Sequence, residues 1–194
     1  MDSSIKIVDN FLDNNTFWAL ESFFMSTDMQ WNYNPGTVKD VDPNNLTDFQ
    51  FVRTLYDNGP SRDMNVIYQI FDKLDVRIPM RVKLNLNTVT PEIIKRDFHI
   101  DQSNCNDIPC KTAILYMNTN NGYTLMADEG VNIKAVQTLD TVEFKTDNNE
   151  DVFRDQNKSM SIRNKCTIHD GSRPHCSSTC TDEKIRILIA INYF

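Results

Sequence analysis

The chain ends in IRILIAINYF, residues 185–194, where apolar side chains fill nearly every position. Successive side chains of a β-strand point to opposite faces, so the four isoleucines share one face. The other face carries Arg186, Leu188, Ala190 and Asn192. The isoleucine face is suited to packing beneath helices, which places Arg186 on the interior face. A buried guanidinium there needs an anion, either a ligand carboxylate held by its planar fork or an Asp or Glu of the protein.

Two amphipathic helices are predicted ahead of the main sheet. Asp13 or Asn14 is a good N-cap for a helix that runs to residue 25, and Ser61 for a helix that runs to residue 74. The residues around these helices are expected to form short strands at 5–8, 28–34 and 49–56.

Residues 80–87 alternate strictly between polar and apolar side chains, which is typical of a half-buried strand. The polar face, with Arg81, Lys83, Asn85 and Asn87, is either solvated or lines a polar cavity. Short strands with turn residues between them are expected at 99–101, 111–118, 123–126, 131–136, 141–144, 160–162, 165–168 and 185–194. A long loop, dense in Asp and Asn, is expected at 146–158.

This order of elements predicts an α+β chain, mainly β, whose β part is a sandwich or jelly roll with helices on the outer face of one sheet. The length of 194 residues favours one domain. Within it, residues 1–78 would form a helical N-terminal support and residues 79–194 the jelly-roll core.

The composition is that of an ordinary globular protein, with 40% hydrophobic and 24% charged residues. A net charge of -7 without a run of Lys and Arg argues against a nucleic-acid partner. The first residues lack the apolar core of a signal peptide, and no apolar run is long enough to cross a membrane, so a cytoplasmic location is expected. Five cysteines without a CxxC pair indicate free thiols.

A candidate metal site lies in Phe98-His99-Ile100-Asp101. In an extended strand, His99 and Asp101 point to the same face and can aim an imidazole and a carboxylate at one point. Two histidines and one carboxylate on one face of a metal are the ligand set of non-haem Fe(II) oxygenases. His175 is the candidate third ligand, and His169 competes for that role.

Several of these residues together carry a family resemblance. Their order is a His-x-Asp motif at His99, a Tyr-Met-Asn segment that starts at Tyr116 and precedes a Gly turn, a downstream His, and Arg186 at the opening of the last strand. This order resembles the Fe(II)/2-oxoglutarate-dependent dioxygenases, in particular the prolyl 4-hydroxylase-like branch. The resemblance covers about half of the chain, from near Arg81 to the C-terminus.

The resemblance implies a double-stranded β-helix with His99, Asp101 and His175 as iron ligands. Arg186 would bind the distal carboxylate of 2-oxoglutarate, and Tyr116 would hydrogen-bond the same group unless it is a core aromatic with its hydroxyl at the surface. Lys83 and Asn85 would reach the cosubstrate or substrate from the neighbouring strand. His175 is preferred to His169 because its distance in sequence from Arg186 is close to that of the family.

The implied activity uses Fe(II), 2-oxoglutarate and O₂ to hydroxylate a C–H bond, with succinate and CO₂ as products. The sequence does not distinguish a prolyl residue in a peptide from a small metabolite as the substrate. It also does not distinguish a monomer from a homodimer. One alternative is a non-catalytic jelly-roll module for binding or structure. Another is a cupin-type dioxygenase without 2-oxoglutarate. Arg186 and Tyr116 argue against it, because a site without a cosubstrate needs no buried arginine.

Overall fold

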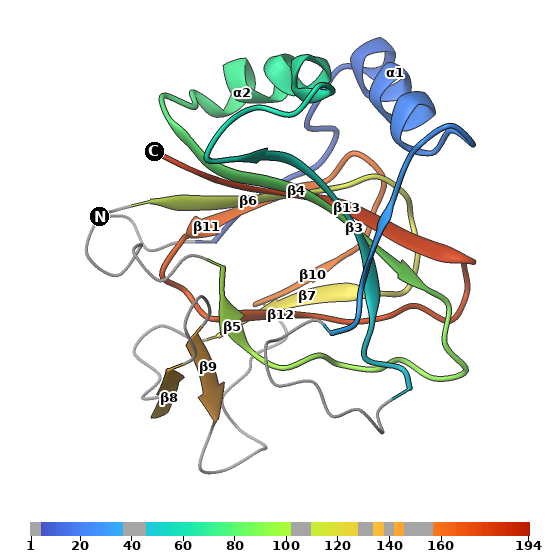
Figure 1. The fold of residues 1–194 in the computed structure, drawn as a ribbon, viewed down its shortest axis with the longest axis vertical. Helices are drawn as coiled ribbons and strands as arrows, with labels where there is room; N and C mark the ends of the chain where they lie inside the picture. Colours follow the sequence, from blue (N-terminus) through green and yellow to red (C-terminus); the bar gives the residue numbers. More distant parts are fainter. Residues whose placement is uncertain (1–4, 37–45, 102–109, 128–133, 138–141, 146–156) are drawn as a thin grey trace.

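The computed structural model describes residues 5–36, 46–101, 110–127, 134–137, 142–145 and 157–194. The described chain is mostly β, with two antiparallel sheets that face one another and helices on one side (Figure 1). Within these residues, none of the helices has the length and apolar character needed to cross a membrane.

Seven strands form the first sheet. Their spatial order is β1 (Lys6–Val8), β11 (Cys166–Asp170), β6 (Lys111–Tyr116), β13 (Ile185–Tyr193), β4 (Pro79–Thr88), β3 (Gln50–Asp57) and β2 (Asn32–Asn34). β13 lies between β6 and β4 and is antiparallel to both. The residues before 79 therefore add three strands to this sheet as well as the helices.

Six strands form the second sheet. Their order is β10 (Lys158–Met160), β7 (Tyr123–Met126), β12 (His175–Ser177), β5 (His99–Ile100), β9 (Val142–Lys145) and β8 (Lys134–Gln137). β12 is central and pairs with both β5 and β7. This sheet lies on the side of the first sheet that faces away from the helices (Figure 1).

The helices α1 (Asn14–Phe24) and α2 (Tyr68–Leu74), with the 3₁₀ helix η1 (Met64–Ile67), cover the outer face of the first sheet (Figure 1). The Asp13 side chain caps α1 as predicted, accepting hydrogen bonds from Asn15 N at 3.1 Å and Thr16 N at 3.0 Å. One hydrophobic core joins both helices to the sheet. It includes Phe17, Leu20, Phe24, Ile70, Phe71, Val82, Leu84, Leu115, Ile187, Ile189 and Ile191.

The faces predicted for the alternating strands are confirmed. In β13 the isoleucines pack toward the helices, whereas Leu188 joins Ile114 and Tyr116 in a separate cluster on the inner face. β4 divides in the same way, with Val82 and Leu84 buried in the helix-side core. The sheet therefore presents its polar alternate residues to the space between the sheets.

Some predicted boundaries are wrong. Ser61 does not cap the second helix, because a 3₁₀ turn that begins at Met64 precedes α2 and has Asp63 at its N-cap position. The strand expected at 28–34 is limited to β2, and the one expected at 160–162 begins earlier, at Lys158. Most of the loop expected at 146–158 lies outside the described residues, and its last residue belongs to β10.

The expectation of free thiols holds for three of the cysteines and fails for one. Cys166, Cys176 and Cys180 are free and buried, whereas Cys110 is disulfide-bonded. Cys105 lies outside the described residues.

Candidate metal centre

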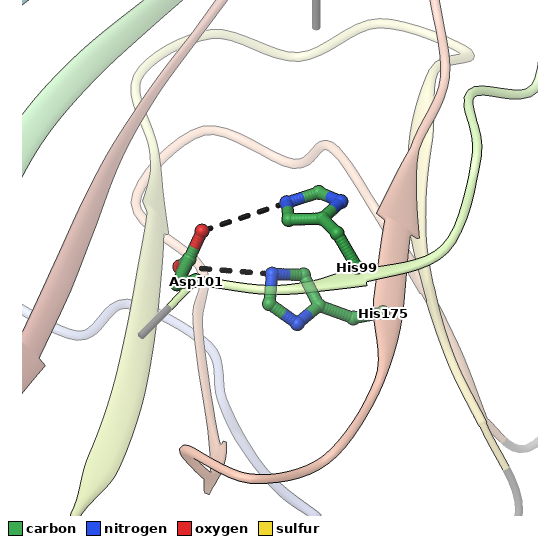
Figure 2. A group of neighbouring side chains, drawn as sticks. All are labelled: His99, Asp101 and His175. Carbon is green, nitrogen blue, oxygen red and sulfur yellow. Dashed lines mark ion pairs between the residues drawn. The ribbon is translucent and has the colours of Figure 1, made fainter. Parts of the chain in front are cut away.

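His99 and His175 lie directly opposite one another on neighbouring strands. β5 and β12 are antiparallel, and the register pairs these two residues. Directly opposed residues of an antiparallel pair carry their side chains on the same face of the sheet. The two imidazole rings consequently lie with their centroids 4.8 Å apart (Figure 2).

Asp101 completes a three-residue cluster. It follows β5, and its carboxylate faces both rings in Figure 2, with Oδ1 3.5 Å from His99 Nε2 and Oδ2 3.7 Å from His175 Nε2. One ligand atom of each residue lies within 4.8 Å of the others. The fold therefore brings together the two histidines and the carboxylate that the sequence singled out.

Backbone carbonyls orient both imidazoles. Nδ1 of His99 lies 3.3 Å from the Asp97 carbonyl oxygen, and Nδ1 of His175 lies 3.2 Å from that of Arg173. A carbonyl oxygen only accepts, so in each ring Nδ1 carries the proton and donates it. Each Nε2 then keeps its lone pair and faces the carboxylate, which is the arrangement that a metal-binding histidine requires.

Two further residues hold the carboxylate in place. Arg81 Nη2 donates to Asp101 Oδ1 at 3.0 Å, and Asn192 Nδ2 donates to Oδ2 at 3.1 Å. Burial would raise the pKa of Asp101, but its contact with the His99 imidazole and the charge of Arg81 outweigh burial and hold this pKa well below its usual range. Asp101 is therefore an anion that is fixed in position.

His175 is a neutral imidazole. It is buried, and burial lowers its pKa to about 3, although the charge of Asp101 acts in the opposite direction. The neutral form is the one that binds metal ions. The donor set at this point consists of an anionic carboxylate and an uncharged imidazole, together with the ring of His99.

His169 lies beside this cluster and belongs to the other sheet. It is on β11, its ring centroid lies 5.0 Å from that of His175, and its Nδ1 donates to the Asp170 carbonyl oxygen at 2.8 Å. Among the described residues, the metal-competent cluster contains His175 and leaves His169 out. His169 therefore lies where a residue that packs against the His175 ring would lie.

Arg186 is fully buried on the inner face of β13. Its Nε donates to Ser161 Oγ at 2.7 Å and its Nη2 to Thr124 Oγ1 at 3.2 Å, while Nη1 has no partner in the described part of the chain. Across those same residues, none of its contacts is a carboxylate, so the alternative of an internal salt bridge finds no support there. Neutral hydroxyls leave its charge uncompensated.

Tyr116 and Asn118 position the region around Arg186. The Tyr116 ring lies 5.6 Å from the Arg186 guanidinium, and its buried hydroxyl donates to the Ser159 carbonyl oxygen at 3.3 Å, so this hydroxyl is not at the surface. Asn118 donates to the Ile185 carbonyl oxygen at 2.8 Å and accepts from Ile187 N at 3.0 Å. These two bonds fix the backbone on both sides of Arg186.

A cavity of about 100 Å³ lies between the sheets. His99, Asp101 and His175 line it, and so do Lys83 and Asn85. The polar face of the alternating strand at residues 80–87 therefore lines a cavity. Arg186 and Tyr116 are not in its lining. Thr124 is, and it separates the Arg186 guanidinium from the open space.

No role in the site was predicted for Asn192, Thr124 and Ser161, and Arg81 was placed only on a strand face that either is solvated or lines a polar cavity. Strand parity carried a signal for two of them, since Arg81 shares a face with Lys83 and Asn192 shares a face with Arg186. Ser161 lies just after a short strand, where periodicity is uninformative.

The comparisons with known proteins give structural matches only. No family model and no curated protein match the sequence. The structure is similar to a prolyl hydroxylase from Trichoplax adhaerens, solved with a hypoxia inducible factor oxygen degradation domain peptide fragment, with a TM-score of 0.60, 13% identity, and coverage of 100% of this chain and 84% of that one.

Two further structures are also similar. A Pseudomonas putida prolyl-4-hydroxylase matches with a TM-score of 0.58 and 13% identity over 99% of this chain and 92% of that one. The epimerase SnoN, in complex with Fe3+, alpha ketoglutarate and nogalamycin RO, matches with a TM-score of 0.55 and 12% identity over 98% and 79%. The chain thus has the fold of the 2-oxoglutarate- and iron-dependent oxygenases, among which prolyl hydroxylases are its structural neighbours.

Proposed function

We propose that this protein is an Fe(II)- and 2-oxoglutarate-dependent dioxygenase that hydroxylates a C–H bond of its substrate. In the balanced reaction, O₂ supplies one oxygen atom to the new hydroxyl group and the other to succinate, while 2-oxoglutarate loses CO₂. The iron, when bound, supplies the redox chemistry and O₂ activation. The chain supplies the ligands, the cosubstrate site and the shielded cavity.

The observation that carries the proposal is the convergence of His99, Asp101 and His175. Two imidazole Nε2 atoms and one carboxylate face a common point, and both Nδ1 atoms are held by carbonyls. This donor set fits Fe(II), because two histidines and one carboxylate would occupy one face of the metal and would leave its other positions for cosubstrate and oxygen. Arg81 and Asn192 keep the carboxylate oriented.

Arg186 is our candidate for the distal carboxylate of 2-oxoglutarate. It is a buried guanidinium with an unpartnered Nη1 and only hydroxyl partners, so an incoming carboxylate would offset its charge. Thr124, which contacts both Arg186 and the cavity, would have to share or yield this position. Tyr116 would support the guanidinium from its other side.

We further infer that residues 1–194 form a single domain whose two sheets make a double-stranded β-helix, or jelly roll. The continuous first sheet, which takes strands from both ends of the chain, supports this. The substrate is a prolyl residue in a peptide or a small metabolite. Similar structures contain ligands of both classes: the Trichoplax adhaerens prolyl hydroxylase was solved with a peptide fragment, and SnoN was solved with nogalamycin RO.

The alternative of a non-catalytic module is less consistent with the site. A packing role for His175 leaves unexplained why its Nε2 faces a buried carboxylate while its Nδ1 is bonded to a carbonyl. A cupin-type dioxygenase without cosubstrate would leave the Arg186 charge without a purpose.

Iron-dependent formation of succinate from 2-oxoglutarate tests the proposal. We expect the wild-type protein to form succinate with Fe(II) even without a substrate, and to show a weak visible charge-transfer band when it binds both under anaerobic conditions. His99→Ala and Asp101→Ala should lose both signals. Full turnover in either variant contradicts the assignment.

Asp97→Ala is the matched control for Asp101→Ala. Both carboxylates lie two residues from His99, but the Asp97 residue is exposed and its side chain is not in the cavity lining. This variant should keep the band and the turnover. Arg186→Met should mainly raise the KM for 2-oxoglutarate, and an unchanged KM would assign the distal carboxylate to another cation.

A further inference from the structure

The cavity lining contains a cation that the proposed cosubstrate does not use. Three basic side chains that are not histidine line it, namely Arg81, Lys83 and Arg96. Arg81 is paired with Asp101 at 3.0 Å, and Arg96 with Asp48 at 2.9 Å. Within the described chain, Lys83 has neither a hydrogen bond nor an ion pair.

The environment of Lys83 disfavours a bare ammonium group. It lies on β4 and is only partly exposed, and burial, followed by the charge of Arg81, lowers the pKa of Lys83. Lys83 shares its face of the strand with Arg81 and Asn85, while Ala190 is its partner on β13. On the other side of β4, Lys83 lies opposite Thr54 of β3, so neither directly opposite residue carries a charge. The charges of Asp101 and Asp57 act against the lowering of the pKa, but they contribute less than burial and Arg81.

The register separates Lys83 from Arg186. Arg186 is opposite Asn87, four residues along β4 from Lys83, which corresponds to roughly 13 Å along the strand. The distal end of 2-oxoglutarate has a single carboxylate and can neutralise one of these cations. With Arg186 assigned to it, Lys83 remains for another ligand.

Measured along the direction of β4, Lys83 lies nearer to the metal centre than Arg186 does. It is two residues from Arg81, which contacts the ligand Asp101, and Ala190, opposite Lys83, is two residues from Asn192, which contacts the same carboxylate. A group bound at Lys83 would therefore lie beside the metal, where the oxidised carbon must be.

We propose that Lys83 binds a carboxylate of the substrate, so that the oxidised molecule is a small organic acid or a peptide with an acidic side chain next to the oxidised carbon. A monoanion matches the single basic side chain of the cavity lining that has no ion pair among the described residues, because Arg81 and Arg96 are already paired. The amides of Asn85 and Gln50, which also line the cavity, can donate to the same carboxylate. This inference rests on the proposed function.

The test compares carboxylic acids with their neutral amides. The panel pairs N-acetylproline with its amide, small monocarboxylates with their amides, and short Glu-Pro peptides with their Gln-Pro counterparts, and adds phenyl phosphate. Binding is measured by thermal shift on protein saturated with 2-oxoglutarate and a redox-inert divalent metal, and oxidation by a mass increase of one oxygen atom.

We expect at least one acid to bind the wild-type protein about tenfold more tightly than its amide, the value of a charge-assisted hydrogen bond. The free acids and the peptides distinguish the two sources of the carboxylate. Lys83→Met should abolish the preference and Lys83→Arg should keep most of it. Lys111→Met is the control, because Lys111 is exposed and is not in the cavity lining, and it should retain the preference.

Three results would overturn the proposal. One is a panel in which no acid is preferred over its amide. Another is a preference for phenyl phosphate over every acid. The third is a Lys83→Met variant whose KM for 2-oxoglutarate rises as much as that of Arg186→Met, because Lys83 would then hold the cosubstrate. Failure of the proposed function shows separately, as a lack of succinate formation, and the acid and amide comparison can still be made on metal-free protein.

Discussion

The space that Arg186 occupies exists because residue 122 is a glycine. A Cβ added at Gly122 would lie 2.6 Å from Cδ of Arg186 and 2.8 Å from the backbone oxygen of Thr179. Atoms at these distances overlap, and the Thr179 oxygen is backbone that cannot rotate away. Gly122 therefore permits the chain to cross closely behind the buried guanidinium.

We predict that Gly122→Ala lowers the free energy of unfolding by about 1–3 kcal/mol, the usual cost of overpacking. The melting temperature should fall by roughly 2–12 °C, and the KM for 2-oxoglutarate should rise because Arg186 is displaced. Gly59→Ala is the control, since a Cβ there meets nothing within 4 Å. Equal melting temperatures for the two variants would show that the Gly122 contact relaxes freely.

Asn192 should matter for metal affinity. Its Nδ2 donates to Asp101 Oδ2 at 3.1 Å and to Thr112 Oγ1 at 2.9 Å, so it orients the carboxylate. Asn192→Leu removes this support, and we expect the dissociation constant for Fe(II) to rise by roughly 10- to 100-fold. Metal titration measures it, with the exposed Asn32→Ala as control. An unchanged dissociation constant for Fe(II) would mean that Arg81 alone is enough to orient the Asp101 carboxylate.

Arg163 should stabilise the attachment of α1 to the sheets. Its Nε and Nη2 donate to the two carboxylate oxygens of Glu21, each at 2.7 Å, and its guanidinium lies 4.5 Å from the Phe17 ring centre. We expect Arg163→Met to cost about 0.5–1 kcal/mol. A double-mutant cycle with Glu21→Gln isolates the ion pair, and its coupling should shrink in high salt. A coupling of zero at low salt contradicts the assignment.

Stability should fall at alkaline pH through buried acids of the helix-side core. Burial raises the pKa of Cys166 from 9.0 to about 12 and that of Tyr193 from 10.0 to about 12. The unfolded chain loses these protons first, so the stabilisation is complete below about pH 9 and is lost as the pH rises toward 12.

Each of these groups contributes up to about 1.4 kcal/mol per pH unit to the slope. Denaturant unfolding between pH 8 and 11 measures this slope, and Cys166→Ala should make it shallower. Parallel slopes for the wild type and the variant would exclude Cys166 as a contributor.

Residue patterns alone predicted the faces of two strands, one helix cap and one pair of candidate metal ligands. The alternation in residues 80–87 and 185–194 assigned the two faces of β4 and β13, because side chains of a strand alternate whatever the rest of the chain does. Asp13 was identifiable as a helix cap because capping acts over three residues. The His99 and Asp101 pair followed from the same two-residue period.

Only the tertiary structure decided which groups meet these residues. β5 has two residues, and its place beside β12 comes from long-range pairing that brings His175 opposite His99. Arg81, Asn192 and Asp101 come from three segments, and no local rule relates them. The sequence thus determined which side chains face inward, and the pairing of distant strands decided which of them converge, because strand periodicity is local whereas strand pairing is not.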